Sequence, residues 1–434
     1  MLVQGIVLAT LLARAGLAAD APERSAAALV RAARSVRPGA AGPSRIADNP
    51  DLPSACRGDT VRTVAVETGG RLFAYRYAYR PAEDPDMPVV FNIPGGPGQG
   101  SIGMPLSVPY EFGIVRTDPL GAGCNANAAL SADALDSEAL AAAVLAVVRD
   151  LHPRRYVLYG ASYGTVVATI AASKARDAGL PDPVAVVLEA VIGRAYRPEE
   201  SQQGFLAGWT RLKKRLPPGA VRVLSQDPPP LGVAPEIWGG WIQQLLLYGA
   251  SPGGGDGFAV DALSKLDPAA PEEGRQLVLD MLRQFAQPAD AAHVALYRSI
   301  VCREIDGATR GQQTDVALRG GELVPLDPGF CGGSSMTRPF DAARYPVSAP
   351  IFYFSGGEDP ATPEFQTRCH YESQRSAAKT WVSVPTGGHL SLTDNLMDCQ
   401  DALWKDIAAT GGSRFPALLR TCGVRPAPVL RPAE

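Results

Sequence analysis

Two kinds of hydrophobic pattern alternate along the first half of this chain. Residues 62–80 show period-two alternation of apolar side chains around Gly69 and Gly70, which predicts a β-hairpin. Apolar runs at 87–93, 112–117, 156–159 and 184–188 predict buried strands, whereas residues 137–151 carry apolar side chains at helical spacing. Because strands and helices alternate, we expect an α/β fold with a mostly parallel sheet and helices on both of its faces.

The pattern changes between about residues 194 and 345. Amphipathic helical runs at 205–216, 237–248, 272–285 and 291–305 are joined by Pro- and Gly-rich links, with no convincing strand among them. The earlier rhythm then returns, with strands expected at 350–354 and 381–384 and helices near 363–375 and 396–410. We therefore expect one α/β domain in two parts, 20–193 and 346–434, interrupted by a helical cap domain at 194–345.

The N-terminus and the cysteines both predict export. Residues 1–13 form an apolar run too short to span a bilayer, and the small residues near Ala19 suit a cleaved signal peptide at 1–19; the alternative is a buried N-terminal helix. Seven cysteines favour disulfides in an oxidising compartment, and their odd number leaves one thiol over. Spacing alone does not determine the pairing. We expect a periplasmic or extracellular protein.

Charge and composition narrow the possible partners. The 434 residues carry a formal net charge of −3 without a basic patch, which disfavours nucleic acid as a partner. The only strongly apolar terminal run is too short for a membrane span, so no membrane partner is expected. With four histidines and no Cys-x-x-Cys pair, the sequence predicts no metal site, and no organic cofactor is implied.

Ser162 is the first candidate for chemistry. A predicted strand at 156–159 runs into Gly160-Ala-Ser162-Tyr-Gly164, and a small-residue run of helical length follows. A strand–turn–helix of this kind strains the serine backbone and needs very small residues two positions before and after it. The hydroxyl then stands at a helix N-terminus, which favours developing negative charge. We predict that Ser162 is a nucleophile; the alternative is a structural serine in a tight turn.

A second Gly-x-Ser-x-Gly sequence serves as an internal control. It contains Ser251, but it follows the predicted helix at 237–248, and the Pro- and Gly-rich residues after it cannot begin a helix. We therefore expect Ser251 in a helix-terminating loop.

A nucleophilic serine needs a base, which after such a turn comes from the end of a later strand. His389 directly follows the predicted strand at 381–384 and a pair of glycines, so it is our candidate. His152 precedes the serine strand, whereas His293 and His370 fall within predicted helices.

The orienting carboxylate is expected between the serine and the histidine in sequence. Glu358 and Asp359 both follow the predicted strand at 350–354. The shorter side chain, set by the proline after it, is the better orienter. We predict Asp359, with Glu358 in solvent.

Two backbone amides can complete such a site by binding an oxyanion. One belongs to Tyr163, which follows the nucleophile, and the other to Gly95 or Gly96 after the strand at 87–93; our expected mechanism uses Gly96. Each donor is worth about 3 kcal/mol of transition-state stabilisation. The alternative for residues 94–98 is a plain turn.

These motifs together resemble the α/β-hydrolase fold, and within it the proline iminopeptidase and tripeptidyl aminopeptidase family of secreted serine peptidases. The resemblance rests on Gly95-Gly-Pro-Gly98, Asp118-Pro-Leu-Gly-Ala-Gly123, Gly160-Ala-Ser-Tyr-Gly-Thr165, Gly356-Gly-Glu-Asp-Pro-Ala-Thr-Pro363 and Gly388-His389. Two further pieces are similar to the tripeptidyl branch: Ser299-Ile-Val-Cys302-Arg-Glu304 and the pair Cys399 and Cys422, for which the resemblance implies a disulfide.

This chain departs from the family in two loops near the substrate. The family usually has histidine where Pro94 stands, and arginine and a later serine where this chain has Leu120 and Cys124. These departures bear on specificity more than on the chemistry.

The resemblance implies an exopeptidase that removes one to three residues from peptides with a free N-terminus. Such an enzyme needs a carboxylate to pair with the substrate ammonium, and our candidates are Glu189 and Glu304, with Glu199 and Glu200 behind them. Two alternatives stay open. One is an esterase or lipase that uses the same three side chains, and the other is a secreted binding protein on a catalytically dead scaffold.

Overall fold

A computed structural model describes residues 54–102, 108–127, 130, 134–197, 200, 202–249, 257–286, 291–306, 316–326, 331 and 336–422. The predicted signal peptide at 1–19 and the control residue Ser251 lie outside the described residues. None of the helices in the described ranges is long and apolar enough to cross a membrane.

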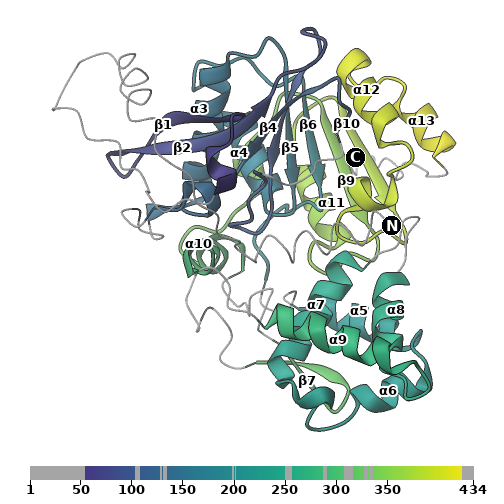
Figure 1. Cartoon of the computed structure of the whole chain (residues 1–434). Coiled ribbons are helices and arrows are strands. Elements are labelled where there is room, and N and C mark those ends of the chain that lie inside the picture. Colours follow the sequence, from purple (N-terminus) through teal and green to yellow (C-terminus); the bar gives the residue numbers. More distant parts are fainter. Residues whose placement is uncertain are drawn as a thin grey trace.

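An eight-stranded sheet forms the centre of the molecule (Figure 1). Its strands, in spatial order, are β1 (Val61–Thr68), β2 (Arg71–Arg80), β4 (Gly113–Thr117), β3 (Val89–Ile93), β5 (Tyr156–Ala161), β6 (Ala185–Glu189), β9 (Ile351–Gly356) and β10 (Lys379–Val384). The predicted hairpin forms β1 and β2, and β2 also pairs antiparallel with β4. All pairs from β4 to β10 are parallel. The predicted fold class is therefore confirmed.

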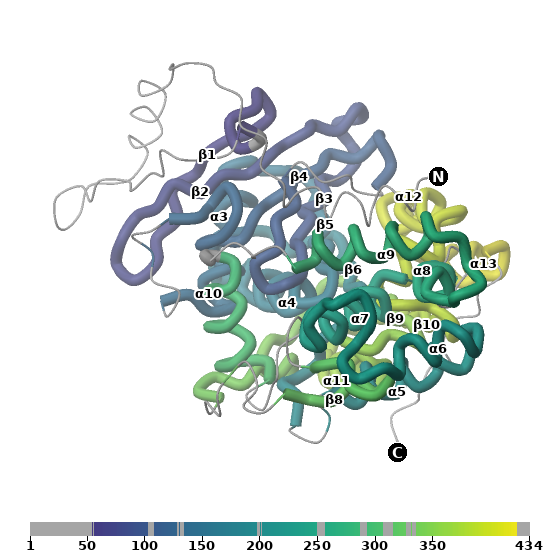
Figure 2. The backbone as a smooth tube through the Cα atoms, turned by 60° about the horizontal axis from the view of Figure 1, so that its bottom comes forward, coloured from purple at the N-terminus to yellow at the C-terminus, as the bar shows by residue number. Residues whose placement is uncertain are grey.

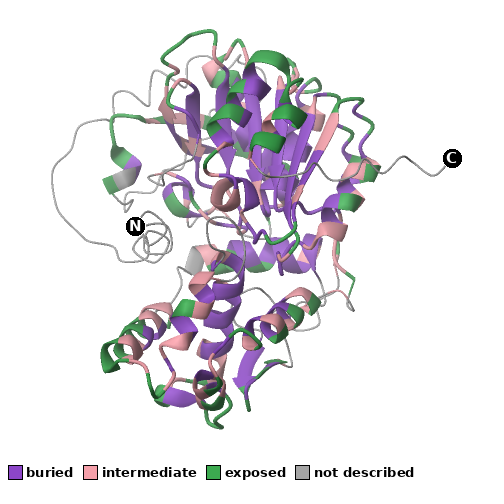
Figure 3. Cartoon of the chain, turned by 90° about the vertical axis from the view of Figure 1, so that its right-hand side faces the viewer, coloured by how far each residue is buried: buried purple, intermediate pink, exposed green. Residues whose placement is uncertain are grey.

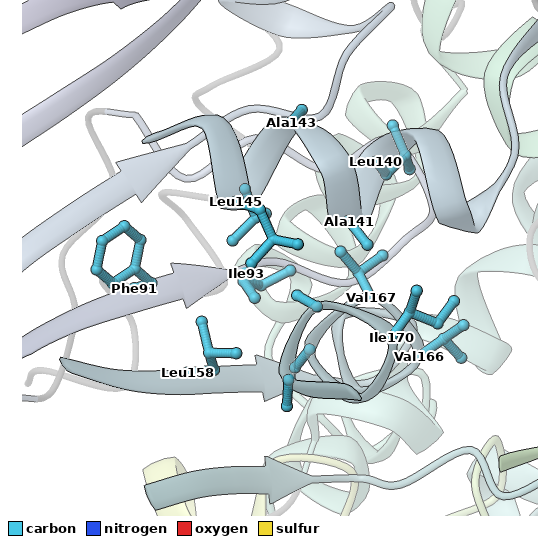
Figure 4. Close-up of a cluster of buried hydrophobic side chains, with 14 of the residues drawn as sticks. Phe91, Ile93, Leu140, Ala141, Ala143, Leu145, Leu158, Val166, Val167 and Ile170 are labelled. Atoms are coloured by element: carbon cyan, nitrogen blue, oxygen red, sulfur yellow. The ribbon is translucent and has the colours of Figure 1, made fainter. Parts of the chain in front are cut away.

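Helices cover both faces of this sheet. One face packs against α3 (Ser137–Leu151), α4 (Gly164–Lys174) and α11 (Glu364–Ser373), and the other against α12 (Gln400–Thr410) and α13 (Phe415–Thr421). Figure 4 shows Leu145 of α3 and Val167 of α4 close to Ile93 of β3, in one continuous core. Strands covered on both faces read as nearly continuous apolar runs, and β3, β5 and β6 do so apart from the buried polar residues Asn92 and Glu189. Figure 3 shows the centre of the molecule as buried.

The inserted segment, residues 194–345, contains a second packing unit below the sheet in Figure 1. Its helices are α5 (Gln203–Lys213), α6 (Pro218–Leu224), α7 (Pro235–Tyr248), α8 (Gly257–Ser264) and α9 (Glu272–Phe285). They share an apolar core with Trp209 and Trp238, separate from the clusters of the central sheet, and Figure 2 shows them grouped together.

The expectation that the inserted segment lacks strands is wrong. β7 (Val316–Arg319) and β8 (Glu322–Pro325) form an antiparallel hairpin. Gly320 and Gly321 connect them with φ angles of 54° and 82°. Two consecutive positive φ angles give the turn whose twist matches a two-stranded ribbon, and glycine adopts them without strain.

The last part of the inserted segment belongs to the α/β core. The predicted helix at 291–305 divides into α10 (Ala291–Ile300) and the π-helical turn η6 (Val301–Ile305). Leu296, Ile300 and Ile305 pack into the same cluster as α3 and α4. A backbone hydrogen bond from Tyr196 N–H to the Ile305 carbonyl ties η6 to the chain that leaves β6. The turn is therefore fixed beside the carboxyl edge of the sheet.

All seven cysteines lie within the described residues. Three disulfides join Cys56 to Cys124, Cys302 to Cys331, and Cys399 to Cys422, and Cys369 is the free thiol. Cys124, one of the departures from the family pattern, thus anchors the Asp118 loop through a covalent bond.

Candidate active site

Ser162 occupies the sharp turn between β5 and α4. Its φ angle is 56°, a left-handed conformation that side-chain-bearing residues rarely adopt. A Cβ at Gly160 would lie 2.4 Å from the Gly164 carbonyl oxygen, and a Cβ at Gly164 would lie 2.1 Å from that of Ile93. Only glycine fits at both positions, which explains the small-residue pattern around the serine.

Hydrogen bonds hold this strained turn from two sides. The Ser162 N–H donates to the Glu189 carbonyl oxygen at 2.8 Å, and the Thr165 hydroxyl donates to the Ser162 carbonyl oxygen at 2.6 Å. Because both backbone groups of the serine are engaged, its main chain is fixed at the end of β5.

Asp359 and His389 meet at the carboxyl ends of the paired strands β9 and β10. His389 Nδ1 lies 3.0 and 2.9 Å from the two Asp359 carboxylate oxygens. The same carboxylate accepts hydrogen bonds from the Thr362 hydroxyl at 2.5 Å and from the N–H groups of Ala361 and Thr362. Four donors therefore fix the orientation of Asp359, and Asp359 fixes that of the imidazole.

The pair titrates as a coupled base and acid. Burial lowers the pKa of His389, but the charge and hydrogen bond of Asp359 outweigh it and raise the pKa above the ordinary 6.5. Burial raises the pKa of Asp359, but His389 and Thr362 outweigh it and the net shift is downward. The carboxylate stays ionised and His389 becomes a stronger base than a free imidazole.

The strand order brings these residues to one edge of the sheet. Ser162 follows β5, Glu189 ends β6, Asp359 follows β9 and His389 follows β10. These four strands are neighbours and parallel. Their carboxyl ends consequently lie side by side, with the serine, the acid and the histidine in the order expected from sequence.

The loop after β3 lies directly against the serine. A Cβ at Gly95 would fall 2.9 Å from Ser162 Cβ, and Gly96 has a φ angle of 114°. Within the described chain, neither the Gly96 amide nor the Tyr163 amide donates a hydrogen bond to a protein acceptor. Gly96, Ser162 and Tyr163 line the same pocket. Two free donors thus border the space in front of the serine.

Glu189 does not fit its predicted role as the partner of a substrate ammonium. The carboxylate is fully buried and accepts hydrogen bonds from the Tyr159 hydroxyl, from the N–H groups of Leu392 and Thr393, and from the Thr393 hydroxyl. Leu392 and Thr393 belong to η8 (Ser391–Asn395), the turn just after His389. Glu189 therefore holds the histidine loop against β6.

Glu304 also has protein partners where a substrate was expected. Its carboxylate accepts from the Ser137 hydroxyl at 2.5 Å and from the Ser137 N–H at 3.2 and 3.3 Å. The Ser137 hydroxyl in turn lies 2.7 Å from the Tyr163 hydroxyl. Burial raises the pKa of Glu304 to about 7, although Ser137 counteracts the shift.

The pocket in front of Ser162 is a cavity of about 60 Å³ with mostly apolar walls. Its apolar side chains come from the segment after β6 (Ile192), from α5 (Phe205) and from η6 (Val301 and Ile305). Glu200, a secondary candidate from the sequence, also lines it, whereas Glu199 lies outside the described residues. Asp306, which sequence reasoning did not select, is a second acidic residue of the lining. The nearest sequence signal for Asp306 is its position two residues after Glu304, within the cysteine-containing stretch near Cys302.

The remaining three histidines lie at other places in the fold, and none of them contacts Asp359 within the described residues. His370 is fully buried between the hydroxyls of Thr169 (2.9 Å) and Tyr353 (3.1 Å), and burial lowers its pKa to about 3. His152 ends α3 in a left-handed conformation. The site of His293 on α10 lies over the glycine loop, since a Cβ at Gly98 would fall 2.8 Å from its Nδ1.

Glu358 lies next to Asp359 but takes a different environment. Its carboxylate is 4.0 Å from the Arg211 guanidinium of α5, so it contacts the inserted segment rather than bulk solvent alone. Asp359 is the neighbour that reaches His389.

The strand order, the strained serine turn and the placement of the aspartate and histidine define an α/β-hydrolase fold. No family model matches the chain, and no curated protein matches it either.

Solved structures show distant likenesses to this chain. Rv0554 from Mycobacterium tuberculosis is 15% identical with a TM-score of 0.45, over 80% of this chain and 99% of that one. A proline iminopeptidase from Mycobacterium smegmatis gives 14% and 0.42, over 79% and 97%. A thermophilic esterase from Thermogutta terrifontis gives 15% and 0.40, also over 79% and 97%. Values this low carry no conclusion about activity, and the fold assignment rests on the topology above.

Proposed function

We propose that the protein is a serine hydrolase that works through Ser162, His389 and Asp359. The observation that carries the proposal is the buried Asp359–His389 pair on the same carboxyl edge of the sheet as a serine held at a φ angle of 56°. A serine turn that serves packing alone has no need of an oriented imidazole on the same edge of the sheet. The pair supplies a base of raised pKa and the carboxylate that steadies its protonated form.

In the proposed reaction His389 takes the proton from Ser162 as the serine oxygen attacks the scissile carbonyl. The negative charge develops on the carbonyl oxygen, and the amides of Tyr163 and Gly96 bind it. His389 then protonates the leaving group, and water, activated by the same imidazole, hydrolyses the acyl-enzyme. Asp359 remains ionised throughout.

We further propose that the substrates are peptides with a free N-terminus, from which the enzyme releases one to three residues. Apolar walls suit the side chain next to the scissile bond, and Asp306 and Glu200 place carboxylates in the same pocket. We assign the ammonium partner to Asp306, which directly follows η6 and lines the pocket together with Val301 and Ile305 of that turn. This assignment replaces Glu189 and Glu304, whose carboxylates already accept protein hydrogen bonds.

Hydrolysis of matched substrates tests both levels of the proposal. Fluorogenic amides with free or acetylated N-termini, and an aryl ester, are assayed with wild type, Ser162→Ala and Asp306→Asn. We expect turnover of the free amides, loss of all turnover in Ser162→Ala, and a KM increase of about tenfold or more in Asp306→Asn for the free amides only.

Each outcome points to one function. Cleavage of the ester alone would replace the peptidase with an esterase, a candidate favoured by the apolar side chains that dominate the pocket wall. Absence of any Ser162-dependent turnover would leave a binding protein on a dead scaffold. Equal turnover of free and acetylated amides would reject a dedicated ammonium partner.

Export is part of the proposal. The three disulfides of the described chain support folding in an oxidising compartment. Fractionation of cells that produce the full-length chain, with N-terminal sequencing of the product, is expected to find it outside the cytoplasm and cleaved near residue 19. A full-length product in the cytoplasm would contradict export.

A further inference from the structure

The amide of Tyr163 is connected to the inserted segment through a chain of side chains. The Tyr163 hydroxyl lies 2.7 Å from the Ser137 hydroxyl, which donates to Glu304 at 2.5 Å. Ser137 is the first residue of α3, and Glu304 belongs to η6 in the inserted segment. All three residues are buried. The ring of Tyr163, which follows the nucleophile, is therefore held by a carboxylate of the inserted segment.

The Gly96 amide has a separate connection to the same segment. Residues 95–99 form a tight turn in which the Gln99 N–H donates to the Gly95 carbonyl oxygen at 3.3 Å. The Gln99 chain lies so close over Gly96 that a Cβ there would fall 2.8 Å from Gln99 N. Burial raises the pKa of Tyr248, the last residue of α7, and the Gln99 side chain beside its hydroxyl counteracts that rise.

Tyr248 also touches the histidine. Its ring centre lies 6.0 Å from that of His389, with the rings nearly perpendicular at 78°. One aromatic side chain of the inserted segment thus spans the glycine loop on one side of the serine and the base on the other.

We propose that the inserted segment sets the geometry of the oxyanion site through two independent contacts: Glu304–Ser137–Tyr163 for one donor, and Tyr248–Gln99 for the other. This inference rests on the proposed hydrolase function. The four side chains other than Tyr163 are positioning residues, because they act on the donors through the backbone and touch no reacting atom. A displacement of well under 1 Å at such donors lowers the rate of the chemical step more than it weakens substrate binding.

A set of hydroxyl and charge deletions tests the two contacts. Tyr163→Phe keeps the amide and removes the hydroxyl, and Glu304→Gln removes the charge. Tyr248→Phe keeps the ring on His389 but removes the hydroxyl that lies beside the Gln99 side chain. The readouts are kcat and KM with an aryl ester and the rate at which a fluorophosphonate labels Ser162. We expect each variant to lower kcat and the labelling rate by about tenfold, with KM within about twofold of wild type.

Double variants distinguish one contact from two. Tyr163 and Glu304 lie on one chain, so combining Tyr163→Phe with Glu304→Gln should lower kcat little beyond either change alone. Tyr163 and Tyr248 lie on different contacts, so combining Tyr163→Phe with Tyr248→Phe should multiply to about one hundredfold. Tyr156→Phe is the matched control, because its hydroxyl donates to the Pro181 carbonyl, away from the site, and kcat should be unchanged.

Different results would contradict the proposed hydrolase function and the proposed role of the inserted segment. Wild-type protein that neither hydrolyses the ester nor labels at Ser162 would contradict the proposed function and this inference with it. If wild type reacts and the single variants keep kcat within about twofold, or change KM alone, the inference is wrong and the hydrolase stands. Thermal unfolding of each variant checks the fold, and the conservative Tyr163→Phe and Tyr248→Phe decide the result if Glu304→Gln does not fold.

Discussion

His389 is 3% exposed and has both Asp359 oxygens within 3.0 Å of Nδ1. A buried imidazole without the carboxylate would lose basicity, since burial disfavours its charged form. Asp359 outweighs the effect of burial and raises the pKa of His389. The protonation state of His389 near neutral pH therefore depends on this one neighbour.

The first prediction concerns this neighbour. Asp359→Asn should lower kcat by about 10³- to 10⁴-fold and shift the acid limb of kcat/KM to lower pH. In wild type the active form is neutral His389, so activity should rise with pH through a pKa above 6.5. A pH profile of ester hydrolysis for both proteins measures this. Full wild-type activity at pH 4 would reject His389 as the base.

The buried carboxylates show which roles of single residues could not be predicted from the sequence. Ser162, Asp359 and His389 could be selected because each follows a strand end within a local motif, whereas the roles of Glu189 and Glu304 depend on donors more than 160 residues away. Asp306 was missed because nothing adjacent to it in sequence reveals which pocket it lines. The order of elements in the chain therefore predicts which residues lie at the strand ends, but it does not predict which donors a buried carboxylate will contact.

The second prediction tests whether Glu189 stabilises the loop after His389, rather than binding the substrate ammonium. Glu189→Ala leaves the N–H groups of Leu392 and Thr393 without their acceptor and should lower the free energy of unfolding by about 3 kcal/mol. Glu272→Ala, which removes an exposed ion pair with Arg275, should cost less than about 0.5 kcal/mol. Urea unfolding compares the two; equal stabilities would contradict the role assigned to Glu189.

Among the elements, η6 has the most connections to the site. This π-helical turn supplies Val301 and Ile305 to the pocket wall and Glu304 to Ser137, and it is followed directly by Asp306. The Cys302–Cys331 disulfide ties it to a residue 29 positions further along the chain. A wide turn of this kind sits at the end of α10, where a regular helix was expected.

The third prediction compares two disulfides with similar loop lengths. Removing Cys302–Cys331 (separation 29) or Cys399–Cys422 (separation 23) by paired Cys→Ala changes should cost similar stability, about 2 to 4 kcal/mol. Only the first should raise KM, because only that bond braces pocket residues. Michaelis constants and thermal unfolding of the two variants measure the difference, and an equal rise in KM would count against a special role of η6.

The two hairpins explain which elements a sequence reveals. Both turn at a pair of glycines with positive φ angles, Gly69 with Gly70 and Gly320 with Gly321. The first was predicted because strands of 8 and 10 residues show clear alternation. The second has strands of 4 residues each within a helical region, too short for a periodic signal.

At the scale of the whole molecule, raised carboxyl pKa values carry a pH-dependent cost in stability, and Glu304 and Asp394 are the examples used below. Burial raises the pKa of both Glu304 and Asp394 to about 7, and Glu189 adds to the shift of Asp394. In the unfolded chain both titrate near 4. Between these values the folded protein binds more protons than the unfolded one, so each group makes stability fall as pH rises from about 4 to 7.

The fourth prediction follows from that sign. Asp394→Asn removes one of these groups, so the difference in unfolding free energy between pH 5 and pH 8 should shift toward greater relative stability at pH 8. Urea titrations of wild type and variant at both pH values measure it. An unchanged difference would mean that Asp394 titrates normally in the folded state.

The pairing of β6 with β9 has a consequence for synthesis. These neighbouring strands are separated in the chain by the whole inserted segment, from Glu189 to Ile351. A nascent chain leaving the ribosome can complete the serine turn long before the acid and the histidine exist. A partly synthesised protein therefore has a nucleophile without a base, and the chain gains its chemistry only when nearly all of it has been translated.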